Sequence, residues 1–460
     1  MTLAKQIIYG NNEDVARTLA HEEDINVIDE YGYTPLIQTA IVNSLSKAQL
    51  LIDAGAQIDF PDLTGRTALN WAASNNNYGL CKLLLQKGAN SNAYTNAGQA
   101  VLVIPYLKQY NSIRRLLTKN GANLDFALDF INAKLMGHRF ELEGRADIVD
   151  TNNTFIEMEL EGFYLEFSLN MLLHSLQDFT HNFGGKNLVK YFPKFEVIIS
   201  ALQNAANILQ YQNYLIDVEK NRKQIDTLLN ANPLILPILF AGHAITLIKF
   251  WDILIRCDRG EFGRKNGTVI GYQINNPHAL TKTFIKHLLY RRQDPEFINS
   301  GLQEYLDLEP MWQMKLPPQI SGNCSWANVE AAIPAIIFTL FLDEQSGKKV
   351  KTCHDRAIQI YNEWINWDQE RSLDSCIQSF HEALPIRQAS IATLLAATLF
   401  QRLQYHNPQD RARAEKILPL ITQPKYQYIL KSYIKVFSRA KNNEMLRNLH
   451  EFLDDFGVEL

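Results

Sequence analysis

A 33-residue repeat in the first third of the chain limits most strongly what this protein can fold into. Two sets of three glycines, each spaced by 33 residues, mark the repeat: Gly32, Gly65 and Gly98, and Gly55, Gly88 and Gly121. Self-similarity at a period of about 20 to 50 residues is typical of stacked repeat architectures. The period therefore predicts a stack of roughly two and a half to four repeats over residues 1–130.

The repeat units resemble ankyrin repeats. Two helix starts read Gly32-Tyr33-Thr34-Pro35-Leu36 and Gly65-Arg66-Thr67-Ala68-Leu69-Asn70-Trp71-Ala72-Ala73, close to the ankyrin pattern G-x-T-P-L-H-x-A-A. Thr34 can cap its helix, and Pro35 takes the first helical position, where no N–H is needed. The repeats at both ends are degenerate, as expected of units that cap a stack. Glu22 stands in place of a glycine, and Ala100-Val101 replace Thr-Pro.

Aromatic residues fall where ankyrin stacks contact other proteins. Tyr31, Phe60 and Tyr94 lie at predicted hairpin tips, and Trp71 lies on a neighbouring inner helix that faces the concave side. Large aromatic residues carry much of the binding energy at protein interfaces. These four are our candidate partner-binding residues, with the alternative that some of them only pack between repeats.

The composition argues against several classes of protein. The 460 residues include 45 Lys+Arg and 49 Asp+Glu, a net charge of -4, whereas nucleic-acid-binding proteins usually carry a basic excess. Five cysteines without a CxxC pair argue against a disulfide scaffold or zinc module and favour a reducing compartment. We therefore expect a monomer without metal, cofactor or direct contact with nucleic acid.

No segment predicts a membrane protein. The N-terminal Met1 to Gln6 opens an amphipathic segment without the apolar core and cleavage site of a secretory signal. Residues 232–248 carry no formal charge but contain Pro233, Pro237 and Gly242, and they fall short of the roughly 20 residues that span a bilayer. We interpret this segment as buried core.

The middle of the chain mixes strand and helix patterns. Strands are expected at 140–144 and 155–160, followed by helices at 161–180, 193–212 and 214–230. The run from 240 to 260 predicts a hairpin centred between Phe250 and Trp251, which sets His243 opposite Asp258. A further strand is expected at 268–274, after a turn at Lys265-Asn266-Gly267.

A polar, glycine-containing loop then leads into an apolar helix. Cys324 stands at the start of this helix, and Gln319 lies five residues before it. Exposed N–H groups and the helix dipole lower the pKa of a thiol at such a place. Cys324 is therefore the cysteine whose surroundings indicate a reactive group.

These elements together resemble the papain-like cysteine protease superfamily, in which a cysteine at a helix N-terminus faces a histidine on a strand. The resemblance implies that Cys324 is the nucleophile, His243 the general base and Asp258 the group that fixes the imidazole tautomer. It also implies that the Gln319 side-chain amide and the Cys324 backbone N–H hold the oxyanion. The order His, Asp, Cys differs from that of papain, but it occurs in ubiquitin-like-protein proteases and in related bacterial acetyltransferase effectors.

Some features depart from this pattern or compete with it. Trp326 is two residues after the cysteine, where papain has it adjacent, and Pro334 should kink or end the helix. The helical stretch before His243 is interpreted as an insertion. His138 is the main rival of His243, and the remaining thiols are interpreted as core: Cys81, Cys257, Cys353 and Cys376.

From about residue 346 the chain is helical in pattern, with helices expected at 352–366, 372–383, 387–404, 410–420, 424–439 and 442–456. The last ten residues, 451–460, are acidic with hydrophobic interruptions. They resemble the uncleaved export signals of type IV secreted effectors, and the alternative is a frayed helix end.

As a whole, the chain resembles the ankyrin-repeat effectors that Legionella exports through its type IV (Dot/Icm) system. The resemblance implies export into the cytoplasm or nucleus of a host cell, through contact of the C-terminus with the secretion machinery. It also implies that the repeats dock a host protein. Because residues 232–248 are too short and too interrupted to span a bilayer, we expect no membrane contact.

We therefore predict an α+β protein in three parts. These are ankyrin repeats (1–130), a papain-like domain with a helical insertion (131–345) and a helical region (346–460). The predicted function is docking of a host protein together with thiol hydrolysis of a peptide or isopeptide bond. Two alternatives stay open: a non-catalytic binding effector whose protease-like domain is a scaffold, and an acyltransferase with the same triad, which would require coenzyme A.

Overall fold

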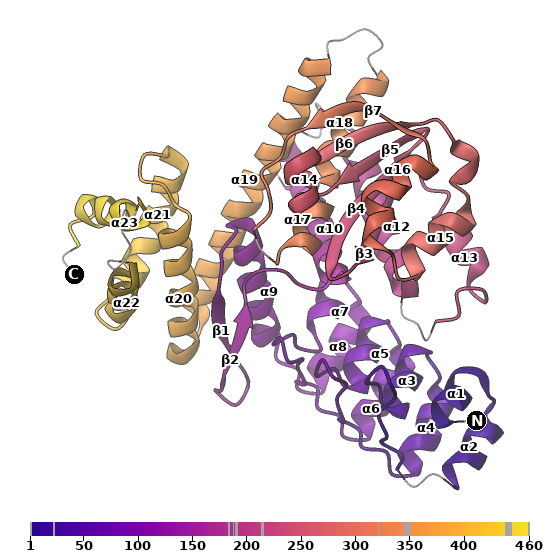
Figure 1. The fold of residues 1–460 in the computed structure, drawn as a ribbon. Coiled ribbons are helices and arrows are strands. Elements are labelled where there is room, and N and C mark those ends of the chain that lie inside the picture. The colour runs from indigo at the N-terminus through magenta and orange to yellow at the C-terminus, as the bar shows by residue number, and fades with distance from the viewer. Residues whose placement is uncertain are drawn as a thin grey trace. The chain divides into compact units, whose positions relative to one another are not determined.

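The 33-residue period folds as a stack of helix pairs (Figure 1). In the computed structural model these helices are α1 (Leu3–Tyr9), α2 (Asn12–Leu19), α3 (Pro35–Ile41), α4 (Leu45–Asp53), α5 (Ala68–Ser74), α6 (Tyr78–Gln86), α7 (Val103–Leu107) and α8 (Asn111–Lys119). Thr34 caps α3 by accepting a hydrogen bond from the N–H of Ile37 at 3.2 Å. Gly55 and Gly88, which follow α4 and α6, have φ values of 98° and 92°, the left-handed conformation that favours glycine. The predicted ankyrin stack is confirmed.

Two sets of residues form separate packed units. The structure describes residues 2–21, 24–182, 185–186, 188, 192–212, 216–320, 322–344, 350–437 and 444–458. Glu22, which replaces a glycine of the repeat pattern, lies outside the described residues. The first unit combines Met1–Leu160 with Gln369–Leu460, and the second is Glu161–Asp368. The repeats and the C-terminal helices thus share a unit, and the three-part division of the sequence stays a prediction.

A long helix and a hairpin follow the repeats: α9 (Leu124–Arg139), β1 (Arg145–Val149) and β2 (Phe155–Glu159). The strand predicted at 140–144 is wrong. Phe140 ends α9, and the N–H of Leu142 closes the helix by donating to the carbonyl of Gly137 at 2.8 Å. Glu141 has a φ of 47°, which lies outside the β region, so the strand starts only at residue 145.

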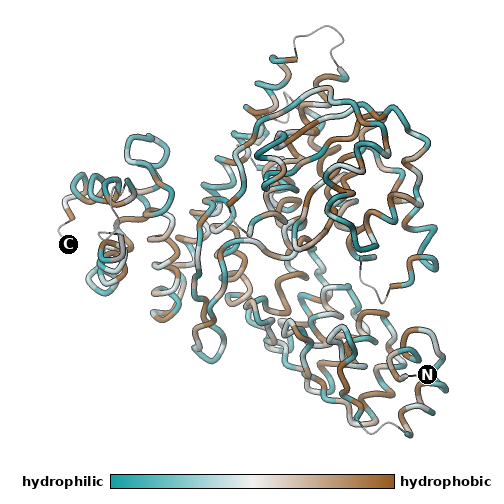
Figure 2. Tube along the Cα trace, viewed as in Figure 1, coloured by the Kyte–Doolittle hydropathy of each residue, from teal (hydrophilic) through white to brown (hydrophobic). Residues whose placement is uncertain are grey.

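The second unit is built around a five-stranded antiparallel sheet in which each strand pairs with the next along the chain. Its strands are β3 (Leu234–Phe240), β4 (His243–Phe250), β5 (Ile253–Cys257), β6 (Val269–Ile274) and β7 (Leu308–Met314). The sequence predicts β4, β5 and β6, whereas it indicates only buried core at β3 and gives no prediction for β7. Hydrophobic residues follow one another along β3 and β4, as Figure 2 shows, and most of them are buried.

Helices pack against both faces of this sheet. On one face, apolar side chains of the strands share a core with α12 (Phe195–Leu209), α13 (Arg222–Leu228) and α15 (Lys282–Tyr290). On the other face, α17 (Cys324–Glu330) contacts β4, and the Phe338 ring of α18 (Ala332–Glu344) meets Trp312 of β7 edge to face. The remaining elements are α10 (Leu165–His181), η1 (Gln210–Gln212), α14 (Glu261–Asn266), η2 (Pro277–Ala279), η3 (Phe297–Gly301) and α16 (Leu302–Tyr305).

In the hairpin that carries His243, each residue of β4 pairs with a residue two positions further along the chain than predicted, which moves the centre of the turn by one residue. Phe250 pairs with Ile253, so the turn lies at Trp251-Asp252 and not between Phe250 and Trp251. Trp251 has a φ of 53° in this turn. As a result, Asp258 does not lie directly across from His243 but just beyond the end of β5.

The most apolar helical run is part of the core of the second unit. Cys324–Asp343 is long and apolar enough to cross a membrane, but 94% of its most apolar window is buried inside the protein. The run is interrupted between α17 and α18, as predicted. Pro334 has no N–H for the carbonyl of Glu330, and its ring crowds that carbonyl.

The C-terminal part consists of helices, although one predicted break is wrong. α19 (Val350–Glu382) runs without interruption through the predicted gap at 366–372, which contains neither glycine nor proline. The later helices agree with the prediction: α20 (Pro385–Gln401), α21 (Pro408–Ile421), α22 (Gln427–Phe437) and α23 (Glu444–Asp455).

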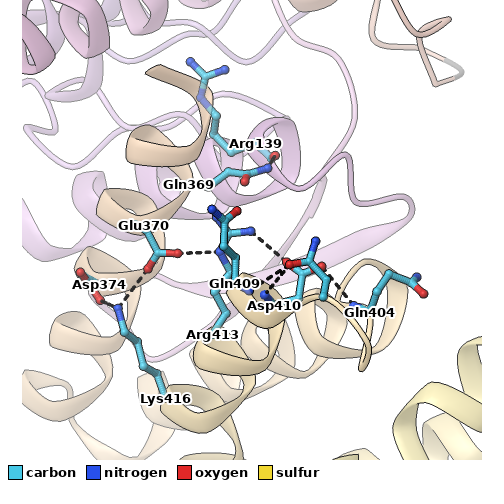
Figure 3. A network of polar contacts seen from close by, with 10 residues as sticks. Arg139, Gln369, Glu370, Asp374, Gln404, Gln409, Asp410, Arg413 and Lys416 are labelled. Atoms are coloured by element: carbon cyan, nitrogen blue, oxygen red, sulfur yellow. Dashed lines mark hydrogen bonds and ion pairs between the residues drawn. The ribbon is translucent and has the colours of Figure 1, made fainter. Parts of the chain in front are cut away.

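Charged side chains join α19 to α21 in the first unit (Figure 3). Arg413 donates hydrogen bonds to Glu370 at 2.6 Å and to Asp410 at 3.0 Å, and its side chain is only 5% exposed. Lys416 pairs with Glu370 and Asp374 but is 40% exposed. Removing one partner of a buried ion pair strongly destabilises the folded protein, because the other charge stays buried without compensation. Arg413 is therefore the residue on which the contact between α19 and α21 depends most.

We predict that Arg413→Ala lowers the free energy of unfolding of the first unit by about 3 kcal/mol, because the buried carboxylate of Asp410 loses its ion-pair partner and keeps only the backbone N–H of Gln404 as a donor. Denaturant unfolding followed by circular dichroism measures this change. The matched variant Lys416→Ala removes exposed ion pairs and should cost only about 0.5 kcal/mol. Equal losses in the two variants would contradict the prediction.

Candidate functional site

Three of the predicted residues meet in the second unit although they lie far apart along the chain. His243 is the first residue of β4, Asp258 follows β5, and Cys324 is the first residue of α17. Nε2 of His243 lies 3.2 Å from Oδ1 of Asp258. The Cys324 thiol is near enough to the imidazole that each of the two groups shifts the pKa of the other. A thiol, an imidazole and a carboxylate in this order form the arrangement of a nucleophilic cysteine site.

The neighbours of Cys324 and His243 favour the charged forms of both. Burial raises the pKa of the thiol, but the hydrogen bond with His243 and the backbone N–H groups of Ala244 and Ser325 bring it below its ordinary value. The hydrogen bond with Asp258, followed by that with Cys324, raises the pKa of His243 to about 9. These shifts favour a thiolate–imidazolium pair between the lowered pKa of the thiol and about pH 9. The thiolate is the reactive form of cysteine.

Asp258 is fully buried and ionised. Burial raises its pKa, but hydrogen bonds from His243 and Arg256 outweigh this effect and lower it. Nη2 of Arg256 lies 2.9 Å from Oδ2, and the Gly260 N–H donates to Oδ1 at 3.0 Å. Arg256 in turn donates to two oxygens of η3, the carbonyl of Ile298 and Oδ1 of Asn299. Our sequence analysis missed Arg256, although its place two residues before Asp258 puts both on one side of an extended chain.

Gly260 is a second residue that the sequence analysis missed. A Cβ atom at this position would lie 2.8 Å from Cε1 of His243 and 3.1 Å from Oδ1 of Asp258. Any larger residue would therefore displace the imidazole or the carboxylate. The signal that could have revealed it is a glycine two residues after the candidate acid, since glycine permits close approach to a site.

Gln319 lies in the loop before α17 and is half-buried. Its backbone N–H donates to the carbonyl of Arg259 at 3.0 Å, which ties the loop to the residue after Asp258. Its Oε1 accepts a hydrogen bond from Nδ2 of Asn328 at 3.4 Å. The amide oxygen is thereby engaged, and the NH2 group is the end that can donate to a substrate. Its role in binding an oxyanion stays a prediction.

The rival residues do not share these features. Burial raises the pKa of Cys81 to about 12, and burial also raises the pKa values of Cys257 and Cys376. Cys353 is buried as well, and His138 lies buried on α9 in the first unit. Within the described residues, no group of three or more His, Cys, Asp or Glu side chains could hold a metal ion.

The four aromatic candidates of the repeats divide into two exposed and two half-buried residues. Tyr31 is 54% exposed and Tyr94 is 38% exposed, whereas Phe60 and Trp71 are half-buried. The Trp71 indole donates to Asp62 at 2.9 Å, which binds it into its own repeat. Tyr31 and Tyr94 are therefore the more accessible members of this set.

Comparison with solved structures extends over the whole chain. The solved structure of the Legionella effector AnkH is 42% identical in sequence, has a TM-score of 0.93, and matches 100% of this chain and 98% of its own. A family model described as ankyrin repeats, in three copies, matches residues 3–95 and 41–127.

Curated relatives match a smaller part of the chain. Human Inversin is 42% identical over 62 residues, which are 14% of this chain and 6% of Inversin. A putative ankyrin repeat protein of Acanthamoeba polyphaga mimivirus is 29% identical over 114 residues, or 24% of this chain and 62% of that protein. The chain thus spans less than two thirds of these relatives, and the likeness adds nothing on activity.

We predict that iodoacetamide alkylates Cys324 rapidly at pH 7, because its thiolate persists below the ordinary pKa of a thiol. In His243→Ala the thiolate of Cys324 loses the contact that stabilises it most, while burial still opposes ionisation of the thiol. The alkylation rate at pH 7 should therefore fall about tenfold or more and recover only at alkaline pH. Mass spectrometry of the Cys324 peptide gives the rates between pH 5 and 10.

The matched control is His406→Ala, which removes an imidazole that is 82% exposed in the first unit. It should leave the pH profile unchanged. An unchanged profile in His243→Ala as well would show that His243 does not activate the thiol.

Proposed function

This chain belongs to the family of the Legionella effector AnkH, and we propose that it acts inside a host cell as an exported effector with two working parts. The ankyrin repeats dock a host protein. The site at Cys324 hydrolyses a peptide or isopeptide bond. The observation that carries the second part is the hydrogen-bonded series Asp258, His243 and Cys324, whose pKa shifts favour a thiolate beside an imidazolium.

The proposed reaction proceeds through an acyl-enzyme. The Cys324 thiolate attacks the carbonyl carbon, a C–S bond forms, and the carbonyl oxygen becomes an oxyanion. As this intermediate collapses, the C–N bond breaks and the His243 imidazolium gives its proton to the leaving amine. Neutral His243 then takes a proton from water, whose oxygen attacks the thioester carbon. The second collapse releases the carboxylic acid and restores the thiolate and the imidazolium.

Stabilisation of the oxyanion is assigned to two N–H donors. The NH2 group of Gln319 can donate because its oxygen already accepts from Asn328. The backbone N–H of Cys324 belongs to the first turn of α17, where N–H groups have no partner within the helix. Preorganised donors of this kind contribute much of the rate enhancement in acyl transfer.

We assign both export and docking to residues of the first unit. We assign docking to the accessible tip residues Tyr31 and Tyr94, since exposed aromatic residues are typical anchors at protein interfaces. The proposed export signal, residues 451–460, begins in the last turns of α23, and residues 459–460 lie outside the described residues.

A second candidate is an effector that only binds its host partner, with the protease-like domain as a scaffold. The family model is one of ankyrin repeats, and the matched mimivirus protein is a putative ankyrin repeat protein. Protein binding is the general role of ankyrin repeats. In this case the exposed tips, and not Cys324, would carry the activity.

We predict that the wild-type protein cleaves a library of linear and lysine-branched peptides, and that Cys324→Ala lowers cleavage at least a thousandfold because the nucleophile is missing. Mass spectrometry in ¹⁸O-labelled water detects the label in each new carboxylate. Cys353→Ala, which alters a buried thiol, is the matched control and should cleave like wild type. Lysine acetylation that depends on added coenzyme A, without cleavage, would instead support the acyltransferase alternative.

We predict that Tyr31→Ala combined with Tyr94→Ala abolishes capture of the host partner, because each change removes an exposed aromatic anchor. Quantitative pull-down from host-cell lysate compares the double variant with wild type and with Cys324→Ala. Tyr78→Ala, an exposed tyrosine (46%) on α6, is the matched control. Full capture by the tip variant would remove these residues from the interface.

A further inference from the structure

Asn328 occupies the place where the segments of the candidate site meet. It lies on α17 four residues after Cys324, so the two residues share one face of the helix and are one turn apart. Its side chain is fully buried, with 0% exposed. A buried amide is costly unless its polar atoms find partners, and the partners of Asn328 all belong to the site.

Three hydrogen bonds connect Asn328 to three separate segments. Oδ1 accepts from the backbone N–H of Arg259, the residue after the buried acid, at 2.6 Å. Nδ2 donates to the carbonyl of Ala244, the residue after His243, at 2.6 Å. Nδ2 also donates to Oε1 of Gln319 at 3.4 Å. The helix of the nucleophile is thereby attached to the strand of the base, to the loop of the acid and to the residue assigned to the oxyanion.

The last of these bonds decides which end of the Gln319 amide faces outward. The two ends of a glutamine amide have nearly the same shape, so only their hydrogen-bond partners distinguish them. Because Nδ2 of Asn328 is a donor, the Gln319 oxygen turns toward it and the NH2 group turns away. The backbone N–H of Gln319 also donates to the Arg259 carbonyl, whose own N–H binds Asn328, so the contacts form a closed ring.

We propose that Asn328 is a positioning residue that presents the NH2 group of Gln319 to the oxygen of an acyl substrate. This inference rests on the proposed function and deepens it. Asn328 touches no reacting atom, and it acts on the oxyanion only through Gln319.

Two probes separate this role from the reactivity of the thiol. Iodoacetamide reports on the thiolate alone, because sulfur displaces iodide from a saturated carbon and no oxyanion develops. N-acetylglycinal, a minimal peptide aldehyde, also reports on the oxyanion site. Sulfur adds to its carbonyl carbon, the oxygen takes the proton of the His243 imidazolium, and a hemithioacetal results. Its affinity is measured as protection of Cys324 from iodoacetamide.

We expect Asn328→Ala to weaken protection by N-acetylglycinal about tenfold or more, while the rate of alkylation without aldehyde stays close to wild type. In a Gln319→Ala background the same change should add little, because two residues that act through one donor are not additive. Thr339→Ala is the matched control, since it removes a buried hydroxyl of α18 that bonds only within its own helix. It should change neither readout.

Several outcomes overturn the inference. One is equal loss of alkylation and protection in Asn328→Ala, which indicates a purely structural role. Others are full additivity with Gln319→Ala, unchanged protection in Asn328→Ala, and absence of protection in the wild type. If Asn328→Ala does not fold, Asn328→Ser, which keeps one polar atom in the side chain, is tested in its place. If neither variant folds, Asn328 is a structural residue and the inference is rejected.

Failure of the proposed function gives a different result. In that case the wild type already lacks rapid alkylation at Cys324, whatever residue 328 is. Rapid alkylation and good protection in the wild type, with no effect of Asn328→Ala, reject the inference alone.

Discussion

A row of charges with alternating sign, from Arg256 through Asp258 and His243 to Cys324, is the interaction on which the candidate site depends. Asp258 is fully buried, and a buried carboxylate is costly unless opposite charges and hydrogen bonds surround it. Arg256 and His243 supply them at 2.9 Å and 3.2 Å. The ionised carboxylate raises the pKa of the imidazole, and the imidazole in turn lowers the pKa of the thiol. Each charge in the row therefore stabilises the next.

The frame around this row comes from the packing of helices on the sheet. The apolar core on one face and α17 with α18 on the other fix the strand ends that carry His243 and Asp258. Asn328 adds the polar contacts that an apolar interface cannot supply, since hydrogen bonds set the register of helix against strand in a directional way. The repeat stack works differently: its units bury their apolar faces against one another and leave tip residues such as Tyr31 accessible.

The prediction of the His243–Asp258 contact shows how sequence reasoning can reach a correct pair through a wrong register. The hairpin turn lies one residue later than predicted, so direct pairing across the strands fails. The contact forms nevertheless, because Asp258 extends beyond β5 and its side chain reaches the imidazole at the start of β4. Close approach at Gly260 makes room for this geometry. Gly260 and Arg256 each lie two residues from Asp258, which is a signal in the sequence, but only the meeting of the strand ends shows which groups they contact.

The sequence by itself determined the ankyrin stack, because its signals are local: a capping threonine, a helix-starting proline and glycines at left-handed turns recur every 33 residues. It also singled out Cys324, since a loop that leads into an apolar helix is visible along the chain. Only the tertiary structure decided which polar groups meet, including Arg256 with Asp258 and Asn328 with Gln319. The reason is physical: partners of buried polar groups are chosen by packing between distant segments, and one sequence carries no local mark of that choice.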